Sequence, residues 1–406
     1  MIDQSAAYDL LDHRLLLAKL SMYNFGDSFT QWMGSYLAGR QETTKVQAWK
    51  SKPIPLGDCG APQGSILAGL LHIISSNDCP AANDVGDSVL FVDDQTDIVV
   101  ADTMEELAVK AQLQADTTCD WLKKNMMVVA PKKTKVMVVT TRELASRRGL
   151  DQPLGITVGG HNITNTQNEG LLGLTIDRHL TWTPHIVGEL WRKKGENDPG
   201  LLYRLSRRAT AVRRLAKTVT PNQLQTLISG LFNSVVQYCL PVYCSNWGPG
   251  QSGENSCKRV LCTKEDMRQI QVLQNKVLRC LVQRQEGLPW SELSRIGAAK
   301  LIARTGTLSV NQRAAPSTVT MLKRMLATGR PERLVGMLHP GSSRLGTLSV
   351  IRKSKHKLWL TSEGFIEKAV RTYNYLPVEI RNIHSYIDFK RQAKFWIKSS
   401  FPPKPP

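Results

Sequence analysis

Two adjacent carboxylates, Asp93 and Asp94, stand between two short apolar runs in SVLFVDDQTDIVVA, residues 88–101. The runs predict a pair of strands, with the acids at the turn that joins them. A plain turn is one interpretation, because aspartate tolerates unusual backbone angles. The preferred two-residue turns, however, use Gly or Asn, and this one has neither. Adjacent carboxylates also repel each other near an apolar sheet, and a divalent cation such as Mg²⁺ would remove that repulsion.

A third carboxylate from elsewhere in the chain would complete a site for two metal ions. Asp3 is the candidate, because in MIDQSAAYDLLDH it stands just before the first predicted helix, where a strand would end. Two divalent ions held by three carboxylates can activate a primer 3′-hydroxyl and neutralise a leaving pyrophosphate. Phosphoryl transfer needs little else beyond positioning and electrostatics. The acids therefore predict nucleotidyl-transfer chemistry.

The elements that must position these acids mix helices and strands without a regular strand–helix alternation. Helical spacing marks residues 9–25, and residues 103–125 read as an amphipathic helix with Thr103 as its N-cap. A loop punctuated by Gly and Pro, GDCGAPQGSIL, precedes another helix. Strands are expected in KVMVVTT, ITVGGHNI and LLGLTID, and basic helical segments dominate after about residue 183. The mixture favours an α+β fold.

Charge is spread unevenly along the 406 residues, whose net charge is +19. Residues 1–100 hold 6 Lys and Arg against 12 Asp and Glu, whereas the remainder holds 47 against 22. This predicts a metal-binding region joined to a nucleic-acid-binding one, and a merely basic soluble protein is the alternative. The eight cysteines and the lack of a signal-peptide pattern indicate a reducing, intracellular setting. The longest apolar run, GSILAGLLHIISS, is too short and too polar to span a membrane.

Three motifs occur in order along the chain: D-x-S-x-A-Y-D at 3–9, G-A-P-Q-G-S-I-L at 60–67 and F-V-D-D at 91–94. Together they resemble the palm of reverse transcriptases, in particular those of non-LTR retrotransposons of the jockey or LINE kind. WLKKNMMVVAPKKTKVMVV is similar to the segment that follows the catalytic hairpin in that family, and LLGLTIDRHLTWTPHI resembles its primer-grip region. The tail AVRTYNYLPVEIRNIHSYIDFKRQAKFWI looks like the end of such polyproteins.

The resemblance implies an RNA-directed DNA polymerase that uses Mg²⁺, with Mn²⁺ as an alternative ion. Its partners would be an RNA template, a DNA primer or target, and dNTPs. A target-primed mechanism would place it in the nucleus. Asp3, Asp93 and Asp94 would be the catalytic metal ligands. Lys133 would donate a proton or charge to the departing pyrophosphate, although Lys132 is a rival and a solvated lysine is the plain alternative.

The same resemblance assigns three residues to substrate binding. Tyr8 would be the steric gate below the incoming sugar, and its alternative is a core aromatic at the start of a helix. Gln63 and Gly64 would lie against the template and the incoming nucleotide, where a backbone without a Cβ can approach closely. A plain surface loop is the alternative for these two residues.

Basic residues lie on a predicted thumb helix, where they could follow the phosphates of an RNA–DNA hybrid: Arg204, Arg207, Arg208, Arg213, Arg214 and Lys217. A solvated helix face is the alternative. Four cysteines are spaced C-x4-C-x12-C-x4-C, which resembles a zinc pattern: Cys239, Cys244, Cys257 and Cys262. The spacing within each pair is looser than structural zinc sites favour, so we interpret them as small buried hydrophobes.

We expect three parts: a partial palm without fingers over 1–182, a helical basic thumb-like region over 183–290, and a C-terminal helical region over 291–406 with a disordered Pro-rich end. Only Met1 and Ile2 precede Asp3, so an N-terminal truncation is expected, without fingers or endonuclease. The alternative from another class is a catalytically inactive, retrotransposon-derived remnant that binds nucleic acid. A group II intron or telomerase-type relative fits the palm but not the tail.

Overall fold

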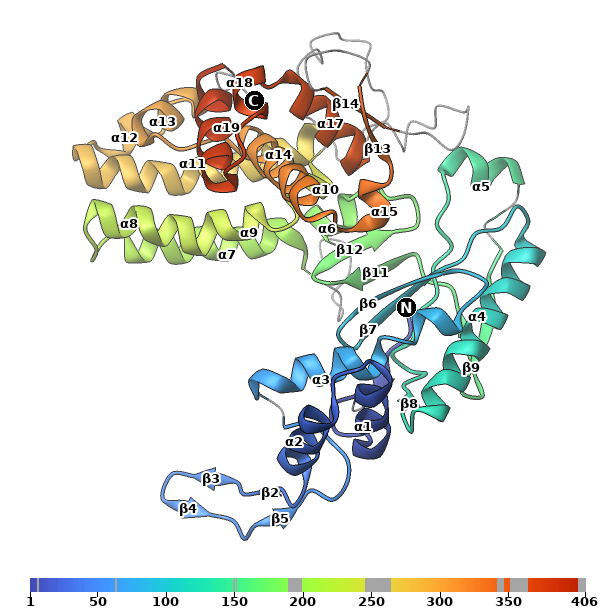
Figure 1. Cartoon of the computed structure of the whole chain (residues 1–406). Helices are drawn as coiled ribbons and strands as arrows, with labels where there is room; N and C mark the ends of the chain where they lie inside the picture. The colour runs from blue at the N-terminus through green and yellow to red at the C-terminus, as the bar shows by residue number, and fades with distance from the viewer. Residues whose placement is uncertain are drawn as a thin grey trace. The chain divides into compact units, whose positions relative to one another are not determined.

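A computed structural model of the protein describes residues 1–5, 7–62, 64–148, 150, 152–188, 199–244, 264–341, 347–350 and 364–400 (Figure 1). These residues fold into two compact units, 1–169 and 170–406. Both units combine helices with short antiparallel strand pairs, a mixture that is compatible with the predicted α+β class. The functional division at residues 182 and 290 stays a prediction. The predicted Pro-rich end, residues 401–406, lies outside the described residues.

The helices of the first unit are α1 (His13–Met22), α2 (Asp27–Leu37), α3 (Ile66–Ser76), the short 3-10 helix η1 (Pro80–Ala82), α4 (Met104–Lys124) and α5 (Arg142–Arg148). Helix α4 begins where the sequence predicts, because the Thr103 hydroxyl accepts a hydrogen bond from the Glu106 amide at 3.1 Å. Helix α1 is capped in the same manner by the Asp12 carboxylate, which accepts hydrogen bonds from two backbone amides.

The strands of the first unit form antiparallel pairs: β1 (Gln4–Ser5) with β8 (Val128–Val129), β2 (Gln41–Glu42) with β5 (Ile54–Pro55), β3 (Lys45–Val46) with β4 (Trp49–Lys50), β6 (Asp87–Phe91) with β7 (Asp94–Ile98), and β9 (Gly155–Val158) with β10 (His161–Thr164). The predicted hairpins at 88–101 and 156–163 are thus confirmed, although the loop of the first is Val92–Asp93 and Asp94, expected in the turn, is the first residue of β7. The strand predicted in KVMVVTT, residues 135–141, is wrong. Among the described residues, Lys135 exchanges two backbone hydrogen bonds with Met1, each at 2.9 Å, and Val136 forms a bridge with Asn165, but no strand extends over the segment.

The core of the first unit gathers the apolar faces of α1, α2, α3 and α4. Leu16 and Leu20 are fully buried one turn apart on α1, and they meet Met33 and Leu37 of α2. Burying each such side chain contributes about 1.5–3 kcal/mol. A smaller cluster packs α4 against β9. Helix α1 thereby anchors the chain after the first motif, residues 3–9, and α3 begins within the second, residues 60–67.

The second unit is mainly helical: α6 (Thr183–Val187), α7 (Gly200–Leu215), α8 (Pro221–Leu227), the π-helix η2 (Ile228–Asn233), α9 (Ser234–Gln237), α10 (Leu240–Tyr243), α11 (Lys264–Glu286), α12 (Trp290–Leu293), α13 (Ala298–Thr305), α14 (Val310–Thr328), α15 (Glu332–Val335), α17 (Phe365–Tyr375), α18 (Val378–Arg381) and α19 (Tyr386–Ser400). Its strand pairs are β11 (Asn168–Leu171) with β12 (Leu174–Asp177), and β13 (Leu338–Pro340) with β14 (Leu348–Val350).

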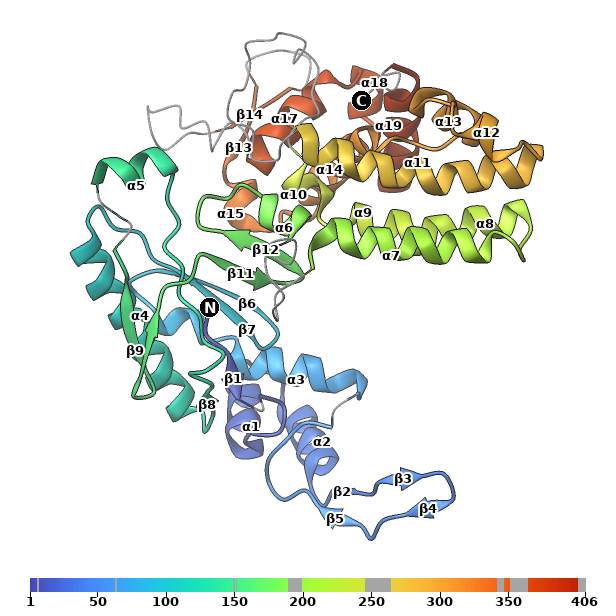
Figure 2. The same cartoon turned by 180° about the vertical axis from the view of Figure 1, so that it is seen from behind.

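Two clusters form most of the core of the second unit. Helix α11 lies beside α7, and apolar residues of both helices and of η2 make one cluster (Figure 2). Residues of α14, α17 and α19 make the other. Within the described ranges, no helix combines the length and the apolar character needed to cross a bilayer.

Candidate active site

The N-terminal segment and the β6–β7 hairpin bring two of the predicted acids to facing positions. The Ile2 amide donates a hydrogen bond to the Gln95 carbonyl at 3.0 Å, and the two residues form an antiparallel bridge. In an antiparallel pair, the residue after one partner faces the residue before the other. Asp3 is therefore opposite Asp94 on neighbouring segments.

The segment that carries Asp3 is also held on its other side. Gln4 is paired with Val129 in the β1–β8 ladder, and the Ala130 amide donates to the Asp3 carbonyl at 2.9 Å. Although only two residues precede Asp3 in this chain, its backbone lies between β7 and the segment that includes β8.

Asp93 lies in a strained turn at the tip of the β6–β7 hairpin. Phe91 is paired with Asp94, so Val92 and Asp93 form a two-residue loop at the tip of the hairpin. Val92 has a φ of 58° at the first loop position, a position that favours glycine when φ is positive. For a β-branched residue this conformation is an outlier that costs about 1–2 kcal/mol. The turn therefore holds Asp93 at the tip against a local preference.

Charge at the three acids is partly uncompensated. Burial of the carboxyl, together with the charges of Asp93 and Asp3, raises the pKa of Asp94. Oδ2 of Asp3 is buried and accepts no hydrogen bond from the described residues, and its one ion-pair partner among them, the Lys133 ammonium, lies 3.5 Å away. Carboxylate oxygens that lack donors and lie near like charges fit the ligand chemistry of Mg²⁺. Among the residues that the structure describes, however, no three His, Cys, Asp or Glu side chains are gathered closely enough to hold one ion.

Lys133 and Lys132, the two candidates for supplying a proton or charge to the pyrophosphate, differ in their distance from the described acids. The ammonium of Lys133 lies 3.5 Å from Oδ2 of Asp3, and 71% of the Lys133 side chain is exposed. The ion pair is thus a loose one at the surface, worth less than about 1 kcal/mol. Lys132 is also exposed. Lys133 is therefore the lysine with its charge at the acid site.

The glycine-rich loop is tied to the segment that follows Asp3. The Ala61 amide donates to the Tyr8 carbonyl at 2.7 Å, and the Gly60 carbonyl is 2.8 Å from Nε2 of His13. A Cβ on Gly60 would lie 3.3 Å from the Asp9 carbonyl oxygen, and the φ of Gly60 is +92°, so glycine is required here. The loop consequently rests on the Tyr8 backbone.

Gly64, the predicted nucleotide contact, has a φ of +81° and open space where a Cβ would be. Its conformation suits glycine, and its surroundings leave room for a ligand. Gln63, its predicted companion, lies outside the described residues.

The predicted gate, Tyr8, is half-buried and packs on a histidine that sequence reasoning missed. The rings of Tyr8 and His72 are 5.1 Å apart at 33°. His72 is fully buried in α3, and neither of its ring nitrogens has a hydrogen-bond partner among the described residues. Burial lowers the pKa of His72, while the charge of Asp93 opposes that shift. The available signal was a lone histidine inside an otherwise apolar helix.

No family model matches the chain. It is 25% identical over 290 residues to the "Probable RNA-directed DNA polymerase from transposon BS" of Drosophila melanogaster, covering 69% of this chain and 28% of the relative. It is 25% identical over 306 residues to the "RNA-directed DNA polymerase from mobile element jockey" of the same fly, covering 71% and 28%. The jockey polymerase of Drosophila funebris is 26% identical over 194 residues, covering 46% and 20%.

The chain is similar to RNA-directed DNA polymerases of the BS and jockey elements over about 70% of its length. This confirms the resemblance stated from the three motifs. The chain spans less than a third of the length of the curated relatives that it matches.

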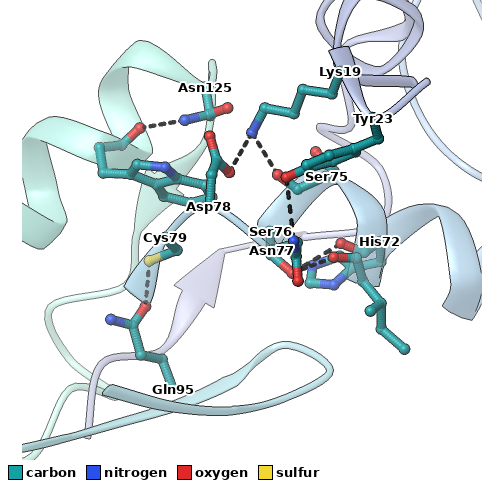
Figure 3. A network of polar contacts seen from close by, with 12 residues as sticks. Lys19, Tyr23, His72, Ser75, Ser76, Asn77, Asp78, Cys79, Gln95 and Asn125 are labelled. Atoms are coloured by element: carbon teal, nitrogen blue, oxygen red, sulfur yellow. Dashed lines mark hydrogen bonds and ion pairs between the residues drawn. The ribbon is translucent and has the colours of Figure 1, made fainter. Parts of the chain in front are cut away.

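A buried polar network supports the β6–β7 hairpin that carries Asp93 and Asp94. Gln95, directly after the acid pair, is buried and accepts a weak hydrogen bond from the Cys79 thiol at 3.5 Å (Figure 3). Its amide donates to the Asp97 carboxylate at 3.0 Å, and the Ser88 hydroxyl donates to the same oxygen at 2.6 Å. Asp97, the third acid of the hairpin, thus accepts hydrogen bonds from β6 and β7.

Lys19 connects three helices behind the hairpin. Its ammonium donates to the Asp78 carboxylate at 2.7 Å and to the Ser75 carbonyl at the end of α3, and it lies 5.0 Å from the Trp121 ring of α4 (Figure 3). Sequence analysis missed this contact because the partners are far apart in the chain.

In the second unit, α7 presents its cations as a face. Leu201, Leu205 and Val212 are buried at helical spacing, so the opposite side of the helix meets solvent. The exposed cations of α7 are Arg207, Arg208, Arg213 and Arg214, whereas Arg204 is half-buried and Lys217, also exposed, lies beyond the end of the helix. Two of them have partners within the unit: Arg208 donates to the Leu231 carbonyl at 3.0 Å, and the Arg213 guanidinium lies 5.6 Å from the Trp290 ring. Whether this face contacts nucleic acid stays a prediction.

The cysteines of the suspected zinc pattern are only half described. Cys244 is buried in the main cluster of the second unit, and Cys239 is half-buried with a φ of 52°. Cys257 and Cys262 lie outside the described residues.

Proposed function

We propose that this chain is the part of a non-LTR retrotransposon reverse transcriptase that carries the catalytic palm and a helical thumb. It transfers nucleotides from dNTPs to the 3′-hydroxyl of a DNA primer on an RNA template. The observation that carries the proposal is the Ile2–Gln95 bridge, which places Asp3 opposite Asp94 with Asp93 at the adjoining turn. The jockey-type relatives carry names of the same activity.

Asp3, Asp93 and Asp94 would hold Mg²⁺, or Mn²⁺ in its place. When bound, the ions activate the primer 3′-hydroxyl and neutralise the charge on the leaving pyrophosphate. The protein contributes the backbone bridge that fixes Asp3 and Asp94 on neighbouring segments, and the strained turn that presents Asp93. Burial and the repulsion by Asp93 and Asp3 raise the pKa of Asp94, and a bound cation would remove the repulsion.

The substrate would be positioned by the residues around the acids. Tyr8, held from behind by His72, would lie below the incoming sugar and exclude a ribose 2′-hydroxyl. Gly64 would let the backbone approach the nucleotide, since no side chain fills the space beside it. Lys133, at the surface beside Asp3, would supply positive charge to the departing pyrophosphate.

The exposed cations of α7 would follow the phosphates of the RNA–DNA hybrid. Such contacts carry no sequence information, which suits an enzyme that must copy any template. Their strength would fall steeply with salt.

Primer extension by the full chain on an RNA template, with Mg²⁺ and dNTPs, tests the proposal. Extension should occur and should fall at least a hundredfold in Asp93→Asn. Asp84→Asn, which removes an exposed carboxylate of the same unit, should retain it. Equal activity of the two variants would contradict the assignment of the acids.

A second candidate function is nucleic-acid binding without catalysis. It is favoured by the described arrangement of the acids, which does not gather three ligands at one point, and by the contact of Asp3 with Lys133. Salt-sensitive binding of nucleic acid with no extension under either Mg²⁺ or Mn²⁺ would support this candidate.

A further inference from the structure

A ribbon of two strand pairs projects from the helices of the first unit. We call residues 40–57 the basic arm; it comprises β2–β5 at the root and β3–β4 at the tip (Figures 1 and 2). At the root the Leu56 amide donates to the Arg40 carbonyl at 3.0 Å, and midway the Ser51 amide donates to the Thr44 carbonyl at 2.9 Å. Nearly all its side chains are exposed, so packing does not explain its composition.

Most of the positively charged residues among residues 1–100 lie on the basic arm. Residues 1–100 contain 6 Lys and Arg and 12 Asp and Glu. Of these, the arm contains one acid, Glu42, and four cations: Arg40, Lys45, Lys50 and Lys52. Because the rest of residues 1–100 is acidic, the basic arm is the part of this region that suits a polyanionic partner.

The strand register places like charges together at the tip. Lys45 is paired directly with Lys50, and the adjoining pair is Val46 with Trp49. Like charges across a strand pair destabilise it, and an anion between them would remove the repulsion. Lysine also protects exposed strand edges against aggregation, but a tryptophan exposed to 63% does the opposite. The tip therefore presents two cations and one free aromatic ring.

The root of the arm continues into a column of aromatic rings along α2. Ring centroids are 5.3 Å apart from Phe25 to Phe29, 5.7 Å from Phe29 to Trp32 and 6.0 Å from Trp32 to Tyr36. The Arg40 guanidinium lies 5.0 Å from the Tyr36 ring and ends the column. Trp32 and Phe25 are exposed, although α2 buries its opposite face.

We propose that the basic arm and this aromatic column form a binding surface for single-stranded nucleic acid, outside the carboxylate site. Lys45 and Lys50 bind backbone phosphates, and a base stacks on Trp49. Stacking tolerates any base because each has a π face, and cations beside aromatic rings are the usual composition of such surfaces. The proposal does not depend on polymerase activity.

Fluorescence anisotropy of the full chain with a labelled 20-nucleotide oligo(dT) or oligo(rU) tests it. Lys45→Gln with Lys50→Gln should weaken binding about tenfold at low salt and reduce the salt slope by about 1.4, since each single-strand phosphate contact contributes about 0.7. Trp49→Leu should weaken binding about tenfold, and Trp49→Phe should restore most of it. The matched control, Lys123→Gln with Lys124→Gln, removes two exposed charges on α4 of the same unit and should have a smaller effect.

Several results would overturn the proposal. One is an equal loss of affinity in the arm variant and the α4 control. Another is equal affinity for a hairpin duplex, which would show that free bases are not bound. A third is a dimer that Trp49→Leu converts to a monomer while oligonucleotide affinity is unchanged, because the arm would then be a protein interface. Primer extension lost only in Asp93→Asn would separate failure of the carboxylate site from failure of the arm.

Discussion

Asp3 stands opposite Asp94 because the Ile2 amide donates to the Gln95 carbonyl at 3.0 Å. The backbone thus holds two carboxylates on neighbouring segments, next to a third at the turn. Such an arrangement is unfavourable for folding alone. It becomes favourable when a divalent cation lies between the acids.

Asp94→Asn should raise the melting temperature at pH 7–8 when no divalent ion is present. The folded-state pKa of Asp94 is raised by burial and by Asp93 and Asp3. The Asp94 carboxyl therefore contributes its full share of the folding stability at pH values below its pKa in the unfolded chain, about 4. That contribution is lost as the pH rises through the pKa of Asp94 in the folded chain. The gain should be under about 1 kcal/mol because the group is largely exposed, and it should vanish near pH 3.

In the presence of Mg²⁺, the natural chain should melt at a higher temperature than Asp94→Asn. Millimolar MgCl₂ should raise the melting temperature of the natural chain by mass action and that of Asp94→Asn much less. Asp84→Asn is the control and should respond like the natural chain. Thermal melts with and without MgCl₂ measure both effects, and equal Mg²⁺ responses of all three would exclude a cation at these acids.

His72→Phe should stabilise the first unit and make it less sensitive to acid. Both ring nitrogens of His72 lack partners among the described residues, and a buried unsatisfied polar group costs about 1–3 kcal/mol. Because burial lowers the pKa of His72, the folded state resists protonation and the natural chain loses stability as pH falls below about 6.5. Urea titrations at pH 5 and pH 8 should show this loss in the natural chain, and a smaller loss in the variant.

The sequence predicted the parts of the site that are local in the chain. The hairpin of Asp93 and Asp94, the Thr103 cap and the exposed cations of α7 all follow from short-range patterns. The position of the turn was not predicted correctly: the acid pair was expected at the tip, whereas the loop is Val92–Asp93 and the positive φ falls on Val92.

Contacts between distant segments could not be predicted in this way. His72 under Tyr8 and the pairing of Lys19 with Asp78 join segments about sixty residues apart. Neither has a periodic signal, because the partner is supplied by how α1, α3 and α4 pack. The strand predicted at 135–141 was wrong for a related reason. Its branched residues favour extended backbone, but among the described residues the backbone pairing stops after Lys135 with Met1 and Val136 with Asn165.

Val92→Gly should stabilise the hairpin by about 0.5–1 kcal/mol. Relief of the positive φ, worth about 1–2 kcal/mol, exceeds the entropy that glycine adds to the unfolded chain. Val89→Gly is the matched control, because Val89 is exposed in the middle of β6 and its loss should destabilise by a similar amount. In urea unfolding, the free energy of unfolding should increase in Val92→Gly and decrease in Val89→Gly. A loss of stability in both would show that the Val92 conformation carries no strain.

Lys19→Met should be the more damaging of two lysine substitutions in the first unit. The Lys19 side chain is only 12% exposed, and its ammonium donates to Asp78 and to the Ser75 carbonyl beneath the hairpin. Methionine retains the apolar stem but removes charged hydrogen bonds worth about 1.5–3 kcal/mol. Lys110→Met, which breaks an exposed pair with Glu106 within α4, should cost less than about 0.5 kcal/mol. Equal losses in chemical denaturation would show that Lys19 does not join the helices behind the acids.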